Sequence, residues 1–302
     1  EPNIKPNRLM TFIWQLENFP NFSFSTEKLL PNIQNFALQL GEANGMLSSF
    51  SQENKQEVFT EIMLSEALKT SEIEGEYFSR EDVMSSLKVN LGVKDFHKTS
   101  KNKKANAIAL LMIEIQNSYA KTMDKALIQN WHKILMDEEK GINAGIFRTG
   151  AEPMQVVSGS YGNLKVHYEA PPSKDLPQLI NQFLNWYQTF SEKDLGKVGE
   201  AMLFSALVHL YFETLHPFED GNGRIGRALA EKALAEKLEM PIFISLSKAI
   251  EKDKAKYYQE LKKAQRSLKI TDWVVYFFNI LQSALDDTKN LVVFTLKKTN
   301  FF

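Results

Sequence analysis

A short segment near residue 220 combines residue types that can bind phosphates. It reads His-Pro-Phe-Glu-Asp-Gly-Asn-Gly-Arg-Ile-Gly-Arg and runs from His216 to Arg227. Gly221 and Gly223 permit backbone conformations that other residues avoid, and the amides that open the next helix have no partner inside it. Because helix side chains lean toward the N-terminus of their helix, we expect Arg224 and Arg227 to converge there. The spacing predicts a nest for several phosphates.

Two further side chains of this segment suit chemistry beside bound phosphates. Asp220 supplies a hard carboxylate oxygen for Mg²⁺, an ion that proteins bind through one or two carboxylates together with the phosphates of a substrate. His216 stands where the preceding helix must end, and its imidazole can accept a proton from a hydroxyl near neutral pH. The segment therefore predicts proton transfer next to bound phosphates.

Two better-known motifs do not fit the sequence. A Walker A loop needs GxxxxGK followed by Ser or Thr, and the chain contains no such string. An EF-hand loop would place Phe218 and Leu229 at ligand positions, where neither can supply an oxygen from its side chain. His209 lies seven residues before His216, but no third ligand is near, so we expect a buried, hydrogen-bonded histidine rather than a metal site.

The segment resembles the signature of the Fic family, HxFx(D/E)GNGRxxR, at every fixed position from His216 to Arg227. Gly223 separates it from the Doc branch, which has Lys there and acts as a kinase. The resemblance implies an all-α, Fic-type helical domain with a small β-hairpin flap and an N-terminal helical extension. It also implies a protein adenylyltransferase, which moves AMP from ATP to a Ser, Thr or Tyr hydroxyl of a target protein and releases pyrophosphate.

The same resemblance implies a role for each residue of the segment. His216 would be the base that activates the hydroxyl, and Asp220 would bind Mg²⁺ that accompanies ATP. Phe218 would anchor the loop in the core. The implied nucleotide-binding residues are Gly221, Asn222 and Gly223, whose backbone forms an anion hole, and the phosphate clamps Arg224 and Arg227.

A second match lies upstream, where Thr70 to Gly75 fits the inhibitory motif of the family, (S/T)xxxE(G/N). The resemblance implies that Glu74 pairs with Arg227 and blocks the productive pose of the γ-phosphate, as in the class with an N-terminal inhibitory helix. A carboxylate on a guanidinium forms a charge-assisted pair and occupies the place of a phosphate. Some relatives use the same glutamate to orient water and remove AMP, so an AMP-removing hydrolase stays open as an alternative.

A β-hairpin interrupts the helical pattern. The runs Gln155–Ser158 and Leu164–Tyr168 favour strands, and residues 159–163 are typical of a five-residue loop. The resemblance implies that this flap aligns the target by main-chain pairing, through Val166, His167 and Tyr168. Tyr257 and Tyr258 either belong to the core or, as the resemblance implies, wall the adenine pocket.

The rest of the chain must position these residues, and its apolar spacing predicts helices almost throughout. The run Gly196–Leu215 has hardly any polar face, so we expect a central buried helix that ends near His216, before Pro217. An aromatic, irregular segment over Phe12–Phe24 should pack on the main body as a flap. The other expected helices run over about 30–41, 57–70, 104–119, 125–136, 174–190, 224–238, 247–264 and 271–288. We divide the chain into an N-terminal region with the inhibitory motif (1–100), a catalytic core (101–270) and a C-terminal helix (271–302).

Composition restricts the partners. Lys plus Arg (36) nearly equals Asp plus Glu (37), which argues against a field that holds nucleic acid or an anionic membrane. A nucleotide-sensing module whose basic helices touch DNA is therefore only an alternative. The chain has no cysteine, which excludes disulfides and thiol catalysis. With no apolar run long enough to span a bilayer and no export signal, we expect a cytoplasmic protein. The partners that we expect are ATP and a target protein. We also expect the protein to modify itself and to form a homodimer.

Overall fold

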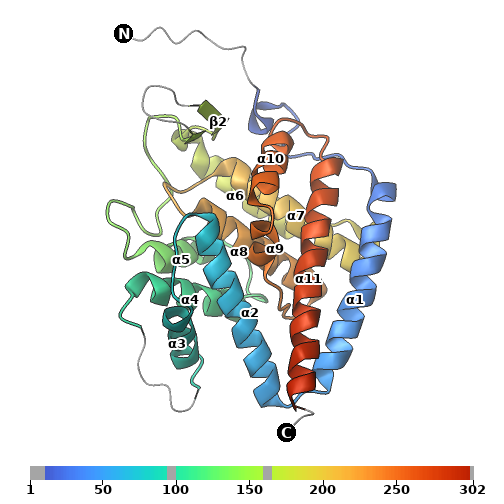
Figure 1. The fold of residues 1–302 in the computed structure, drawn as a ribbon. Helices are drawn as coiled ribbons and strands as arrows, with labels where there is room; N and C mark the ends of the chain where they lie inside the picture. The colour runs from blue at the N-terminus through green and yellow to red at the C-terminus, as the bar shows by residue number, and fades with distance from the viewer. Residues whose placement is uncertain (1–10, 94–99, 159–164, 300–302) are drawn as a thin grey trace.

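The computed structural model describes residues 11–93, 100–158 and 165–299, which fold into a helical body with one small hairpin (Figure 1). The all-α class with a β-hairpin is confirmed. The α-helices are α1 (Leu30–Ser48), α2 (Gln52–Ile73), α3 (Arg80–Asn90), α4 (Lys103–Asn117), α5 (Lys125–Met136), α6 (Leu176–Thr189), α7 (Gly196–Leu215), α8 (Asn222–Leu238), α9 (Leu246–Glu251), α10 (Lys254–Ala264) and α11 (Thr271–Thr299).

Helices α7 and α8 form the centre of the molecule and separate two hydrophobic cores. One core lies between them and the long helices α1 and α11, which run side by side in Figure 1. The other lies between them and α2 to α6. Every residue of α7 from Ala201 to Leu215 is buried, as expected for a run with hardly any polar face. The α7–α8 pair can therefore hold the connecting loop rigidly against both cores.

The N-terminal segment is irregular and packs on the body, as expected. It contains short 3-10 turns over Ile13–Gln15 and Thr26–Lys28. The Ile13 N–H donates to the carbonyl of Gln265 at 2.9 Å, and Ser23 pairs with Lys269 in an isolated β-bridge. The segment thus joins the start of the chain to the end of α10.

The hairpin consists of β1 (Gln155–Ser158) and β2 (Lys165–Glu169), which pair antiparallel with an irregular register between Val156 and Val157. The first strand has the predicted bounds. The predicted loop over 159–163 and the expected first residue of the second strand, Leu164, lie outside the described residues.

Several predicted helices differ from those observed. The continuous helix expected over 247–264 is wrong: the chain breaks between α9 and α10, where the Asp253 side chain accepts the Lys256 N–H at 3.0 Å and caps a new helix. Aspartate favours this capping geometry over a helix interior. Helix α3 was not expected, because few of its residues are apolar, and α1 and α11 extend well beyond their predicted ends.

Within the described ranges 11–93, 100–158 and 165–299, no helix combines the length and apolarity that crossing a bilayer requires.

Phe36→Ala tests whether α1 belongs to the core around α7. Phe36 is fully buried, so we expect the free energy of unfolding to fall by about 3–5 kcal/mol. Leu38 on the same helix is 64% exposed, and Leu38→Ala should change it by less than about 0.5 kcal/mol. Urea unfolding of both variants makes the comparison, and equal losses would contradict this placement of α1.

Candidate functional site

The turn that ends α7 holds the histidine of the signature segment in an unusual conformation. His216 has φ 46° and ψ 58°, in the left-handed region that non-glycine residues seldom adopt. Arg148 stabilises it, because its Nε donates to the His216 carbonyl at 2.8 Å and its Nη2 donates to the carbonyls of Pro171 (2.6 Å) and Leu215 (3.3 Å). Burial lowers the pKa of Arg148 to about 10, so it stays charged at neutral pH. The turn is therefore fixed by a buried cation.

The loop after this turn is closed by side chains that bond to its own backbone. The Asn222 side chain accepts the Phe218 N–H and donates to the Phe218 carbonyl, both at 2.9 Å. Phe218 is fully buried, as expected for a core anchor, and its ring stacks on His132 at 3.7 Å. His132 Nδ1 accepts the Gly145 N–H at 2.8 Å, so its Nε2 can donate to the Asp220 carbonyl at 3.1 Å. Asn222, predicted to bind nucleotide, has both polar ends of its side chain engaged in the loop.

A side chain at either of two glycines of the loop would have to displace a neighbouring side chain. Gly221 has φ 77°, and a Cβ there would lie 2.4 Å from Met136 Cε. A Cβ on Gly223 would lie 2.3 Å from Glu74 Oε1. The Glu74 carboxylate therefore contacts the start of α8, in the position where the sequence predicts a bound phosphate.

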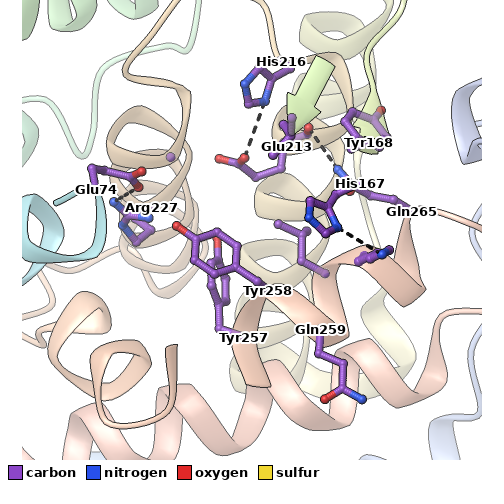
Figure 2. Close-up of a pocket in the computed structure, with 14 residues that line it drawn as sticks. Glu74, His167, Tyr168, Glu213, His216, Arg227, Tyr257, Tyr258, Gln259 and Gln265 are labelled. Carbon is purple, nitrogen blue, oxygen red and sulfur yellow. Dashed lines mark hydrogen bonds and ion pairs between the residues drawn. The ribbon is translucent and has the colours of Figure 1, made fainter. Parts of the chain in front are cut away.

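Arg227 is buried and bound to the end of α2. Its Nε donates to Thr70 Oγ1 at 2.9 Å, and its Nη2 donates to the Thr70 carbonyl at 3.1 Å and to Glu74 Oε1 at 2.8 Å. Burial would raise the pKa of Glu74, but the Arg227 guanidinium outweighs it and the net shift is downward. Figure 2 shows the pair at one end of a cavity. The structure thus brings Glu74 and Arg227 together as the upstream motif predicts.

Arg224 is also paired with the segment that follows α2. Its Nη1 contacts Glu76 Oε2, and Glu76 in turn accepts from Lys104 Nζ at 3.1 Å. Lys104 lies on α4 and also contacts Glu139. Arg224 Nη2 is 3.8 Å from Asp220 Oδ1. Both arginines predicted to clamp phosphates therefore have carboxylate partners from residues 74–76.

The His216 imidazole points into the same cavity. Its side chain is 16% exposed, so a hydroxyl can reach it, and its Nδ1 lies 3.9 Å from Glu213 Oε2 (Figure 2). Burial, helped by the charge of Arg148, lowers the pKa of His216 to about 4. The ring is neutral at pH 7, which is the form that can accept a proton.

The cavity has a volume of about 660 Å³ and lies between the loop, α10 and the hairpin. This size suits a ligand as large as a nucleotide. Tyr257 is buried, with its hydroxyl 2.8 Å from Nε2 of the buried His209, as core packing predicts for both, yet it also lines the cavity. Tyr258 is 41% exposed and lines it too. The sequence left open whether Tyr257 belongs to the core or to the wall of the pocket, and in the structure it does both.

The flap residues divide between the cavity and the surface. His167 and Tyr168 line the cavity, whereas Val166 is exposed beside it. The carbonyls of β2 at His167 and Glu169 accept from Arg266 Nη2 (3.1 Å) and Trp14 Nε1 (2.9 Å). These two carbonyls of β2 thus already accept side-chain hydrogen bonds from within the chain.

A single carboxylate serves the predicted magnesium site. The Asp220 side chain is 59% exposed, and its Oδ1 accepts the Gly221 N–H at 2.5 Å. Across residues 11–93, 100–158 and 165–299 no three His, Asp or Glu side chains are grouped as a metal site. An exposed carboxylate next to a phosphate nest fits an ion that takes most ligands from phosphates and water.

Sequence reasoning missed four residues of this site: Arg148, His132, Glu76 and Glu213. Arg148 and His132 reach the loop from distant parts of the chain, and no local pattern marks them. Glu76 lies one residue beyond the inhibitory motif, which was a usable signal. Glu213 lies in the buried, mostly apolar part of α7, where a carboxylate is itself unusual.

Two family profiles match the chain. The Fic/DOC family matches residues 122–234, and a domain of unknown function (DUF4172) matches residues 12–93.

Curated relatives include proteins named as adenylyltransferases. A probable protein adenylyltransferase from Aquifex aeolicus is 39% identical over 69 residues, which are 23% of this chain and 20% of the relative. Protein adenylyltransferases Fic from Nematostella vectensis and Drosophila melanogaster are 28% and 26% identical over 147 and 217 residues. These alignments cover 48% and 71% of this chain. The chain spans only 32% and 39% of those two relatives.

Solved structures share the fold. A Fic family protein from Desulfovibrio desulfuricans has a TM-score of 0.65 at 19% identity, with 89% of this chain and 75% of that chain covered. A Fic-domain signalling protein from Bacteroides thetaiotaomicron has a TM-score of 0.64 at 17% identity, with 88% and 97% covered.

Arg148→Met tests whether the buried cation fixes the turn at His216. Methionine fills much of the space but leaves the carbonyls of His216 and Pro171 without a donor, so we expect a loss of about 3 kcal/mol in unfolding free energy. Arg80→Met is the control, because Arg80 pairs with Glu61 at the surface and should cost about 1 kcal/mol or less. Urea unfolding measures both, and an Arg148→Met protein as stable as this control would contradict the assignment.

Proposed function

The chain belongs to the Fic/DOC family, and from that premise we propose that it is a protein adenylyltransferase that moves AMP from ATP to a hydroxyl of a target protein. The observation that carries the proposal is a neutral, reachable His216 that shares one cavity with Gly223 and the buried Arg227, both on the first turns of α8. Several relatives bear the name of this activity, but the alignments cover only part of their length. The activity of this chain is therefore our proposal.

The proposed reaction uses groups that already lie together. The target oxygen attacks the α-phosphorus of ATP, the bond from that phosphorus to the bridging oxygen breaks, and pyrophosphate leaves. The hydroxyl proton passes to the imidazole of His216. Backbone amides at Gly221–Gly223 and the guanidinium groups of Arg224 and Arg227 face the phosphate charge, because transfers of this kind depend mainly on positioning and charge stabilisation.

Asp220 is our candidate magnesium ligand. Mg²⁺ bound there with the nucleotide would neutralise part of the phosphate charge. Its exposed carboxylate lies at the start of the same loop, 3.8 Å from Arg224 Nη2. Tyr257, Tyr258 and His167 would surround the base of the nucleotide, since they line the remainder of the cavity.

We also propose that Glu74 inhibits the enzyme. Its carboxylate pairs with Arg227 and lies over Gly223, so a phosphate can reach the start of α8 only after Glu74 moves. The pKa of Glu74 is lowered, so the inhibitory charge is present at neutral pH and is lost only in acid. A target hydroxyl of the chain itself is the simplest first substrate.

Glu74→Gly and His216→Ala test the proposed function together. A charge-assisted pair contributes about 1.5–3 kcal/mol, so Glu74→Gly should raise self-labelling by about ten- to a hundredfold. His216→Ala should abolish labelling in the same background. Mass spectrometry after incubation with magnesium and each nucleoside triphosphate identifies the group added.

Glu72→Gly is the matched control, because Glu72 lies two residues earlier and pairs with Lys69 at the surface. It should label no better than the parent. A Glu74→Gly protein that takes up no label from any nucleotide would contradict the proposed activity. Release of AMP from a labelled target by the parent, but not by Glu74→Gly, would assign the opposite reaction to the same site.

Glu76→Gln tests whether the second carboxylate of this segment also competes with the nucleotide. It removes the partner of Arg224, so the affinity of the Glu74→Gly protein for magnesium ATP should rise by about fivefold, or about 1 kcal/mol. Calorimetric titration measures the affinity. Glu81→Gln, on the exposed face of α3, is the control and should leave it unchanged. Weaker binding by Glu76→Gln would show that Glu76 helps rather than competes.

A further inference from the structure

A buried carboxyl group lies next to the proposed base. Glu213 precedes His216 by one helical turn on α7 and is only 6% exposed. Its Oε2 is 3.9 Å from His216 Nδ1, and in the described part of the chain its Oε1 has no hydrogen-bond partner. Figure 2 shows the carboxyl group pointing into the cavity between His216 and Arg227. A buried polar atom without a partner is costly, so its retention calls for an explanation.

Helix α8 leaves room for this carboxyl group. A Cβ on Gly226 would lie 2.4 Å from Glu213 Oε1, so no other residue fits at 226 without moving it. The backbone carbonyl of Glu213 accepts Gln265 Nε2 at 3.1 Å, which ties this turn of α7 to the end of α10. The side chain is thus held in place while its acid end stays free to interact with the imidazole.

The charges around Glu213 set its ionisation. Burial raises the pKa of Glu213 to about 8, the positive Arg227 lowers it, and the negative Glu74 raises it. When the phosphates of a nucleotide replace Glu74 on Arg227, a negative charge remains in that place. The titratable and charged groups that face the carboxyl group are His209 on α7, His216 directly after α7, Arg227 on α8, Glu74 after α2, Tyr257 and Tyr258 on α10, and Tyr168 on β2.

We propose that Glu213 is a positioning residue that selects the active tautomer of His216; the inference rests on the function proposed above. The ionised carboxylate accepts a hydrogen bond from Nδ1–H, which leaves Nε2 unprotonated toward the incoming hydroxyl. When Nε2 takes the hydroxyl proton, the imidazolium that forms keeps its Nδ1–H on the carboxylate. Glu213 itself gains no proton, and its charge stabilises the cation beside it.

The protonated acid has the opposite effect. A carboxylic acid can donate to Nδ1, and the neutral ring then carries its proton on Nε2, where it cannot act as a base. The proposal therefore predicts that the rate of AMP transfer rises with pH as Glu213 loses its proton, with a midpoint near the pKa of about 8.

The first experiment compares pH profiles in the Glu74→Gly background. At saturating ATP, between about pH 6 and pH 9, the labelling rate should rise by about tenfold per pH unit below the midpoint and then level off. Glu213→Gln keeps the size and a carbonyl acceptor but cannot ionise, so its profile should be flat while its KM for ATP changes by less than about twofold. Glu213→Asp keeps an ionisable group and should restore part of the rise.

Glu200→Gln is the matched control, because Glu200 lies on the same helix and pairs with Lys237 at 2.9 Å, away from the cavity. Its profile should match that of the Glu74→Gly parent. If Glu213→Gln keeps the full rise with pH, the proposed role of Glu213 is wrong.

The second experiment needs no activity. Long-range ¹⁵N–¹H NMR of the full chain, with His216→Ala to identify the signals of that ring, reports which nitrogen carries the proton. The Nδ1–H form should dominate above about pH 8 in the parent and should lose this pH dependence in Glu213→Gln. An unchanged tautomer across the titration in the parent would overturn the inference. If no variant is labelled but the tautomer shift is seen, the proposed function fails and the inference about the His216–Glu213 pair stands.

Discussion

The chain reverses direction between α7 and α8, and the positions of the candidate site residues depend on the hydrogen bonds that hold this turn. His216 adopts a left-handed conformation, so the turn has no intrinsic stability of its own. Arg148 binds the carbonyls that the turn exposes, and Asn222 closes the loop on Phe218. Because these bonds come from buried side chains, the imidazole and the first amides of α8 keep fixed positions without any ligand. The site is therefore largely preformed.

The burial of Arg227 imposes a second constraint. Leaving a buried charge without a partner is costly, so an anion beside this guanidinium stabilises the protein. In the structure that anion is Glu74, at the end of the helix that also supplies Thr70. A phosphate would have the same effect. The proposed inhibition and the proposed nucleotide binding would thus be two ways of placing a negative charge beside one buried guanidinium.

The sequence predicted those features of the fold that residues close together in the chain determine. The bounds of α7 follow from a run with hardly any polar face and from Pro217, and the Glu74–Arg227 contact follows from a motif. The break before α10 was missed because the capping preference of Asp253 competes with a helical pattern that continues through it. Arg148 and Glu213 could not be recognised, because their roles arise from contacts or charges that exist only after α7 has packed against its neighbours. Sequence thus indicated the residues of the candidate site more completely than the residues that hold them in place.

The 3-10 turn over Ile13–Gln15 has a consequence for the wall of the cavity. Ile13 bonds to the carbonyl of Gln265, and Trp14 bonds to the carbonyl of Glu169 in β2. Gln265 in turn donates to the backbone of Glu213. Together these hydrogen bonds connect the hairpin and the end of α10 to the central helix α7. A protein shortened past Gln15 would keep its helical body but lose these hydrogen bonds, and the hairpin and α10 would line the cavity less rigidly.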